Sequence, residues 1–254
     1  QKKPFVIPLA MGLLGESGNL SLTLANNPTE LNMDSHRVLV IDEEVQEYVF
    51  TNVEEKPIPS LLRGFSAPVR LNYSYSRSDL CSLISRDEDE FVRWDASQKL
   101  AVQIINEVEL AVQQDLQVSI DPIILEAWRT LLKDDTLDPA IIAAMVRLPS
   151  EVYLGELASQ KSGINVGSIR KARELVRRFL SQQLREEWLV TYERFRVHQT
   201  YEALATQIAH RSLSNIALEF LACQGESGIE LATIQLAESD NMTDRISSLR
   251  VLAF

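Results

Sequence analysis

The three histidines are the residues of this chain best suited to enzyme chemistry, because imidazole commonly binds metals and moves protons near neutral pH. A zinc peptidase of the zincin type needs His-Glu-x-x-His on a helix, where both imidazoles bind the metal and the glutamate activates water. His36, His198 and His210 are followed instead by Arg-Val-Leu, Gln-Thr-Tyr and Arg-Ser-Leu. We interpret all three as surface or capping histidines and predict no metal-binding residue.

Nucleophilic catalysis also lacks a matching pattern. Cys81 and Cys223 have no signature of a catalytic or metal-binding cysteine, and the chain has no Gly-x-Ser-x-Gly elbow. We predict that both cysteines are reduced, buried thiols on different helices. Gly12, Gly15 and Gly18 recur every three residues, but they fall in a predicted β-hairpin, where turn geometry explains them. The sequence therefore predicts no catalytic and no cofactor-binding residue.

Charged residues gather in two places, and both have a structural interpretation. The acidic residues 87–90 are predicted to begin a helix, where the helix dipole favours negative charge. A predicted helix over residues 168–196 is rich in arginine, but no aromatic residues interleave on its basic face. Glu174 and Arg178 have the i,i+4 spacing of an ion pair, which indicates a solvated surface. The net charge of −11 also argues against a nucleic-acid partner.

Length and composition indicate an ordinary globular protein. The 254 residues suffice for two domains, and 45% hydrophobic with 24% charged residues is the usual balance. No apolar run approaches the roughly 18–20 residues of a membrane span, and we expect a cytoplasmic protein. Gln1 precedes a strand-like sequence almost directly, and Phe254 ends an apolar run. Natural termini are usually polar, so we expect a fragment of a longer protein.

The elements that would position any site fall into a β part and an α part. Short alternating segments separated by turns predict an antiparallel β-sandwich over residues 1–76. Its strands are predicted at 5–14, 20–24, 37–41, 47–53 and 69–75, with the third and fourth paired. Five strands are few for a sandwich with two covered faces.

A helical period begins after residue 76 and predicts an all-α array over residues 77–254. Asp121-Pro122 and Asp138-Pro139 are start signals, with aspartate as the N-cap and proline in the first turn. The helices are predicted at 78–86, from Asp87 or Asp89 onward, and at 122–133, 139–147, 150–160, 168–196 and 201–223. The fold class is therefore α+β and multidomain.

Apolar stripes on these helices predict the core. On the last of them the residues expected to be buried are Leu204, Ile208, Ile216 and Phe220. Trp94, Trp128 and Trp188 each lie on an apolar stripe, so we expect core packing and not ligand stacking.

Two motifs lie at the β–α junction, Pro59-Ser-Leu-Leu-Arg-Gly-Phe-Ser-Ala-Pro-Val69 and Phe91-x-x-Trp94-Asp-Ala-x-Gln98. The first resembles the end of the middle β domain, and the second the start of the helical domain, in the zinc-dependent aminopeptidase N family, of the bacterial membrane alanyl aminopeptidase type. Leu137-Asp-Pro-Ala140, Leu148-Pro-Ser150 and Asn241-Met-Thr-Asp244 follow in the family's order.

The resemblance implies a parent enzyme that removes N-terminal amino acids from peptides with one zinc ion. In that family the zinc ligands and catalytic residues lie in a separate catalytic domain, so no residue here inherits a catalytic, cofactor-binding or metal-binding role. The immunoglobulin-like β domain would act as a spacer, and the helical domain would enclose the active site and limit access. The partner is then the catalytic domain of the same polypeptide.

The resemblance also implies that the β-sandwich lacks its first strands. We expect it to expose a strand edge or an apolar face, and dimerisation there would cover it. The alternative function is a non-enzymatic interaction module, with an immunoglobulin-like domain joined to a helical adaptor.

Overall fold

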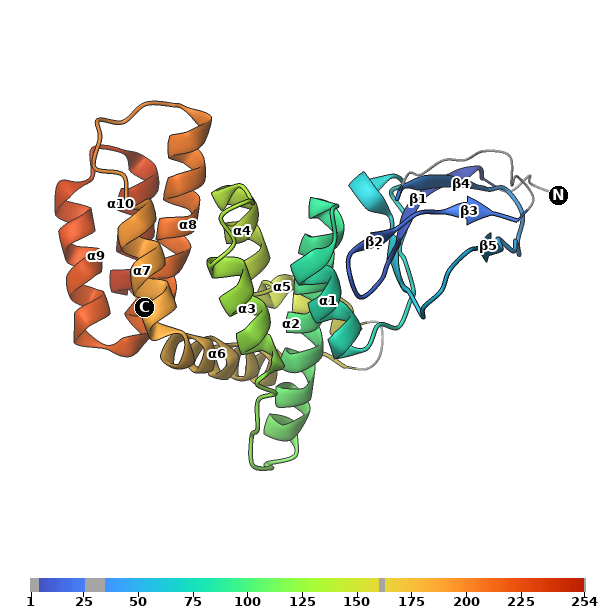
Figure 1. Cartoon of the computed structure of the whole chain (residues 1–254). Helices are drawn as coiled ribbons and strands as arrows, with labels where there is room; N and C mark the ends of the chain where they lie inside the picture. The colour runs from blue at the N-terminus through green and yellow to red at the C-terminus, as the bar shows by residue number, and fades with distance from the viewer. Residues whose placement is uncertain (1–4, 26–34, 160–162, 254) are drawn as a thin grey trace. The chain divides into compact units, whose positions relative to one another are not determined.

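The computed structural model describes residues 5–25, 35–159 and 163–253, and it divides into two compact units, 1–97 and 98–254 (Figure 1). The first unit contains the predicted β domain together with helix α1 (Arg77–Arg86). Helix α2 (Glu90–Gln113) runs through the boundary. The predicted α+β class, strands first and helices after, is confirmed. In the described part of the chain, no helix has the length and apolarity needed to cross a membrane.

Strand β1 (Ile7–Leu14) is the centre of the first unit's sheet, because three other strands pair with it and not with one another. Its antiparallel partners are β2 (Asn19–Leu20), β4 (Arg37–Ile41) and β6 (Ile58–Leu61). Met11 of β1 pairs with two strands, because it lies opposite Arg37 of β4 and opposite Leu61 of β6. The core of this sheet consists of Met11, Leu13, Leu22 and Leu39.

Three strand predictions are wrong. The segment 20–24 is split, because Leu22 turns into the core between β2 and β3 (Thr23–Leu24). The predicted pairing of 37–41 with 47–53 does not occur, since β4 pairs with β1, while β3 pairs with β5 (Phe50–Thr51). Residues 69–75 form no strand, and the last strand is instead β6, which contains Pro59 and pairs with β1. Tyr75 instead donates a hydrogen bond of 2.7 Å to the carbonyl of Pro59.

The outer face of β4 is apolar and exposed. Val38 and Val40 alternate with the buried Leu39 and point away from the core. The exposed apolar face that the sequence predicts is thus present on this strand, and dimerisation through a strand edge stays a prediction.

Arg63 joins the sheet to the first helices. Its side chain is 3% exposed, and it donates to Ser60 Oγ at 2.7 Å and to the carbonyl of Ser35 at 3.0 Å. It also contacts Asn19 Oδ1 and forms a buried ion pair of 3.2 Å with Asp87, the residue that follows α1. The guanidinium therefore joins β2, β6, the segment just before β4 and the end of α1 at one point.

Gly12 leaves the space that this guanidinium occupies. A Cβ atom at position 12 would collide with the Arg63 side chain, so the glycine in β1 is required by a close approach and not by a turn. The turn interpretation is wrong for Gly12 but holds for the hairpin, where Gly15 N–H donates to the carbonyl of Gly18 at 2.8 Å and Gly18 has a φ of 132°.

The helix starts follow the capping signals. Ser76 and Asp79 form a capping box for α1, and Asp89, one of the two predicted caps, accepts from Val92 N–H at 2.9 Å at the start of α2. Asp138 accepts from Ala140 N–H at 2.7 Å at the start of α4. The second unit continues with α3 (Ile123–Leu132), α4 (Pro139–Val146), α5 (Glu151–Ser159), α6 (Val166–Gln183), α7 (Arg185–Phe195), α8 (Ala205–Leu221), α9 (Glu226–Glu238) and α10 (Met242–Ala253).

The single helix predicted over 168–196 is wrong. It breaks at Leu184, whose φ of −114° and ψ of 28° end α6 and begin α7. Trp188 explains the break, because its indole N–H donates to the carbonyl of Leu180 at 3.2 Å and its ring stacks on Phe220 at 4.2 Å. The bend brings a tryptophan of α7 onto α8. Trp128 and Trp188 are both buried, as predicted.

Three residues predicted in the core are exposed: Trp94 by 37%, and Leu204 and Ile208 by 51% each. On α8 the polar side chains of Gln207 and Arg211 take the interior positions, because they bond to one another at 2.9 Å and to the connection before the helix. Periodicity alone therefore assigned the wrong face at the start of α8.

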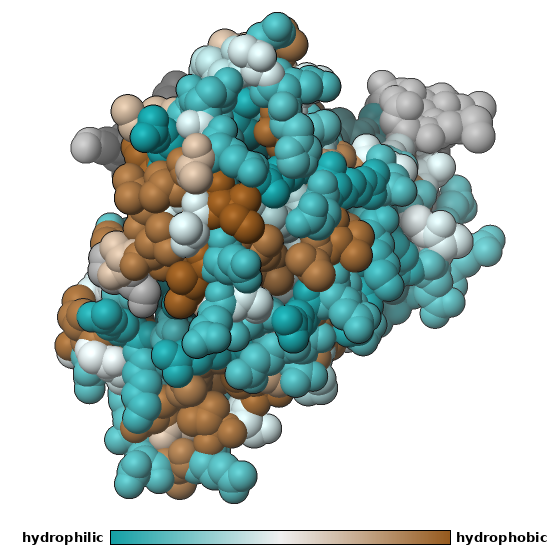
Figure 2. Space-filling view, turned by 90° about the vertical axis from the view of Figure 1, so that its left-hand side faces the viewer, coloured by the Kyte–Doolittle hydropathy of each residue, from teal (hydrophilic) through white to brown (hydrophobic). Residues whose placement is uncertain are grey.

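Helix α10 shows the same inversion. Its buried residues are Asp244, Ser247 and Ser248, while Met242, Ile246 and Leu249 face outward. Figure 2 looks onto the side where α9 and α10 lie in Figure 1 and shows apolar side chains gathered among polar ones.

The buried ion pair yields a stability prediction. Arg63→Met leaves the Asp87 carboxylate buried without its counter-charge, and we expect a loss of about 3–5 kcal/mol. Amide hydrogen exchange of β1 measures it. Arg178→Met, which removes the exposed pair with Glu174 at 2.8 Å, is the matched control and should cost less than about 1 kcal/mol. Equal losses in the two variants would contradict the role given to Arg63.

Candidate functional site

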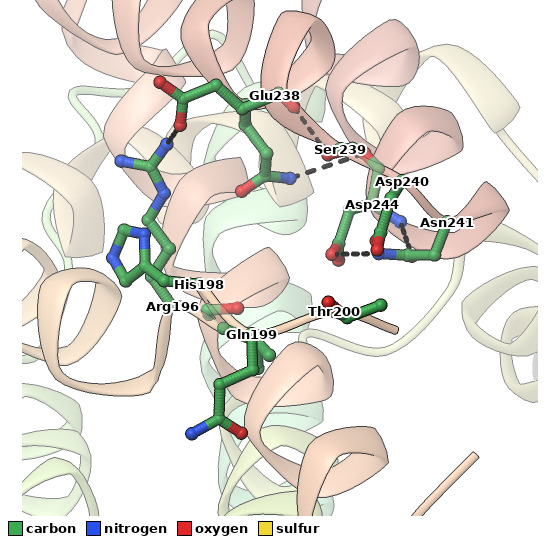
Figure 3. A pocket seen from close by; sticks show the side chains of 12 residues that line it. Arg196, His198, Gln199, Thr200, Glu238, Ser239, Asp240, Asn241 and Asp244 are labelled. Atoms are coloured by element: carbon green, nitrogen blue, oxygen red, sulfur yellow. Dashed lines mark hydrogen bonds and ion pairs between the residues drawn. The ribbon is translucent and has the colours of Figure 1, made fainter. Parts of the chain in front are cut away.

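A polar pocket of about 230 Å³ lies in the second unit (Figure 3). It lies between residues 196–200, which leave α7, and the turn that joins α9 to α10. Gln235 and Ser214 line its inner wall, from α9 and α8. Polar residues dominate its lining, so it is unlike the mostly apolar pockets that bind small molecules.

The wall of the pocket is a buried hydrogen-bond network that joins three helices. Asn215 of α8 donates to Asp244 Oδ1 at 2.7 Å and accepts from Gln235 of α9 at 2.8 Å. Asn241 and Asp244 bond reciprocally at the start of α10, with the Asp244 N–H donating at 2.9 Å and the Asn241 amide at 2.8 Å. Because each polar group is satisfied by another, the network holds α8, α9 and α10 in register.

The outer side of the pocket holds the connection between α7 and α8. Asp240 Oδ2 accepts from the N–H of Tyr201 at 2.8 Å, and Gln207 donates to the carbonyl of Thr200 at 3.2 Å. Arg196 forms an ion pair of 2.5 Å with Glu238. The same connection is thus attached to α8 on one side and to the end of α9 on the other.

The electrostatics of the site favour structure over catalysis. The hydrogen bond from Tyr201 N–H lowers the pKa of Asp240 below its usual 3.8, so this carboxylate is ionised and already bonded at neutral pH. Burial raises the pKa of Tyr192, beneath Arg196, to about 12, which keeps its phenol neutral. Neither group is tuned to exchange a proton near neutral pH.

The structure does not bring the three histidines together. His36 is exposed in the first unit, His198 lies exposed at the pocket, and His210 is half-buried edge-on to Phe195 at 5.3 Å. Over residues 5–25, 35–159 and 163–253, no group of three His, Cys, Asp or Glu side chains could hold a metal. The side chains of the described chain therefore do not fit a zinc centre.

The cysteines are less buried than predicted. Cys81 on α1 and Cys223 after α8 are both half-buried. Burial raises the pKa of Cys223, so its thiol is protonated at neutral pH and is a poor nucleophile.

Two family models cover the chain. Residues 1–74 match "Domain of unknown function (DUF3458) Ig-like fold", and residues 77–254 match "Domain of unknown function (DUF3458_C) ARM repeats". Aminopeptidase N of Escherichia coli (strain K12) is 33% identical over 98% of this chain, and that of Haemophilus influenzae is 31% identical over 96%. The chain belongs to the DUF3458_C family, whose model covers more than half of it, and it is similar to one part of aminopeptidase N.

The aminopeptidase N relatives are much longer than this chain. It spans 28% of the Escherichia coli protein and 27% of the Haemophilus influenzae protein. A solved structure, Legionella pneumophila aminopeptidase A in complex with aspartic acid, matches with a TM-score of 0.77 at 25% identity, over 98% of this chain and 28% of that one. The immunoglobulin-like and helical parts predicted for an aminopeptidase N homologue are confirmed.

Sequence reasoning named His198, Asn241 and Asp244 but did not predict the polar pocket that they line. One signal was available, since Asn241 and Asp244 have the N-cap to N3 spacing of a capping box. The partners Asn215 and Gln235 carry no local signal, because they meet only when α8 and α9 pack.

The network predicts a measurable stability contribution. Asp244→Ala leaves the buried amide of Asn215 unsatisfied, and we expect a loss of about 1–3 kcal/mol. Arg196→Gln, at the surface pair with Glu238, should cost less than about 1 kcal/mol. Urea unfolding of α8–α10, followed by amide exchange, compares the two variants, and a larger effect of Arg196→Gln would contradict the network.

The lowered pKa of Asp240 predicts a pH-dependent connection. The ionised Asp240 carboxylate stabilises the connection between α7 and α8 above pH 3.8. This stabilisation is lost as the pH falls below 3.8 and passes through the pKa of the folded state. The protection factor of the Tyr201 amide, measured by NMR, should therefore drop in acid. The Asp240→Asn variant should have a lower protection factor at neutral pH, and this factor should no longer fall in acid. Protection that is independent of pH in the unmodified chain would refute this.

Proposed function

We propose that this chain is a non-catalytic part of a zinc metallo-aminopeptidase that removes N-terminal amino acids from peptides. The single observation that supports the proposal most strongly is 33% identity to an aminopeptidase N over 98% of the chain. The catalytic domain would belong to the same polypeptide, because the chain spans only 28% of that relative. Peptides would be the substrates of the complete protein, and we propose the cytoplasm as its location.

Within such an enzyme, the immunoglobulin-like domain would act as a spacer and the helical domain would enclose the active site. The physical principle would be exclusion, because a wall of helices can admit peptides and reject folded proteins by shape, with no reactive side chain of its own. The contacts of the second unit support this role. Asp240, Asp244 and Glu238, its carboxylates nearest the pocket, are all engaged in hydrogen bonds or an ion pair that order helices.

Zinc would be held outside this chain. When bound in a catalytic domain, zinc supplies a Lewis acid and an activated water. The described residues contribute no fitting donor set, so the chain's own part would be positional.

A comparison of two proteins tests the proposal. The longest reading frame that contains this chain is expected to hydrolyse alanine p-nitroanilide, whereas the 254-residue chain alone, folded as judged by circular dichroism, is expected to show no turnover. A reading frame without aminopeptidase activity would favour the interaction-module alternative. Turnover by the isolated chain would reject its non-catalytic role.

A further inference from the structure

An aromatic cluster lies on the surface of the first unit. Phe65 precedes the helices and is 55% exposed, and Trp94 on the first turns of α2 is 37% exposed. Phe91 lies between them, with ring centroids 5.2 Å from Phe65 and 5.6 Å from Trp94. The other two tryptophans of the chain are fully buried, so the exposure of Trp94 is the exception that requires an explanation.

The backbone around Phe65 is held in an unfavourable conformation. Leu62, Gly64 and Phe65 all lie in the left-handed region, with φ of 60°, 59° and 52°. This region is disfavoured for residues with a Cβ atom, and it persists only where neighbouring contacts impose it. A segment that folded only for its own stability would not be expected to combine this strain with an exposed phenylalanine.

The contacts that impose the conformation all lie next to Phe65. Arg63 is buried in its ion pair, and Gly64 N–H donates to Asp89 Oδ2 at 2.8 Å. Ser66 Oγ accepts from Ala10 N–H at 2.9 Å. Residues on both sides of Phe65 are thus fixed to α2 and to β1, while its own side chain is directed to the surface beside Phe91.

Acidic residues directly precede Phe91 in the chain. Glu88 and Glu90 are exposed on either side of the capping residue Asp89. Aromatic side chains at the centre and charged groups at the edge are the usual composition of a protein–protein contact with a binding hot spot. The matching surface would be an apolar recess bordered by lysine or arginine.

We propose that Phe65, Phe91 and Trp94 form the surface on which the rest of the aminopeptidase polypeptide packs against the first unit. This inference rests on the proposed function. The partner that we propose for this surface is the rest of the same polypeptide, because this chain accounts for only 28% of the length of the Escherichia coli relative. An intrachain partner also explains a permanent, preformed aromatic surface, since such contacts are more apolar than transient ones.

Hydroxyl-radical footprinting with mass spectrometry tests the surface residue by residue. The 254-residue chain is compared with the protein from the longest reading frame that contains it. We expect oxidation of Phe65 and Trp94 to fall severalfold in the longer protein, because the centre of a protein contact is shielded from water. Trp128 and Trp188, buried in the second unit, are internal controls and should stay unreactive in both.

A pair of variants of the longer protein sharpens the test. Phe65→Ser should weaken the contact and raise the oxidation of Trp94, whereas Val45→Ser, at a residue 84% exposed elsewhere in the first unit, should not. Equal oxidation of Trp94 in the short and long proteins would overturn the proposal. So would protection of Trp94 that rises with the concentration of the short chain, because the occupant would then be a second copy. A failure of the proposed function would be seen in a different measurement, because the longer protein would then not hydrolyse alanine p-nitroanilide.

Discussion

The buried pair of Arg63 and Asp87 is the constraint that ties the sheet of the first unit to its first helices. Burial raises the pKa of Asp87, while hydrogen bonds from Ser60 and the N–H of Asp89 and the charge of Arg63 oppose the rise. A buried pair of this kind adds little net stability over an apolar pair, but it is costly to break. It therefore selects one arrangement, and Gly12 in the central strand is the residue that makes space for it.

The second unit uses polar groups in a similar way. Asn215, Gln235 and Asp244 meet from three helices, and Gln207 with Arg211 fills the interior at the start of α8. Such networks specify how helices align, whereas apolar packing alone tolerates sliding. The cost is that apolar residues such as Ile208 and Leu249 are displaced to the surface.

These two features explain what sequence reasoning found and missed. Capping signals are local, so the starts of α1, α2 and α4 follow from Ser76, Asp89 and Asp138. The family resemblance is local too, since it rests on contiguous motifs. The break at Leu184 and the pairing of β6 with β1 depend on contacts between residues distant in the chain, namely Trp188 with Phe220 and Leu61 with Met11.

The buried polar faces of α8 and α10 escaped prediction for the same reason. Hydrophobic periodicity assumes that apolar residues face inward. At Gln207 and Asp244 that assumption fails, because hydrogen bonds to other elements satisfy the buried polar groups. The pocket could not be located from sequence, although the Asn241–Asp244 cap at its edge could have been.

We propose that this chain orders helices and surfaces and holds no zinc ion of its own. Isothermal titration of the folded 254-residue chain with Zn²⁺ tests this proposal. We expect no stoichiometric site of micromolar or tighter affinity, because the described side chains offer no convergent donor set. A single site of sub-micromolar affinity would contradict it.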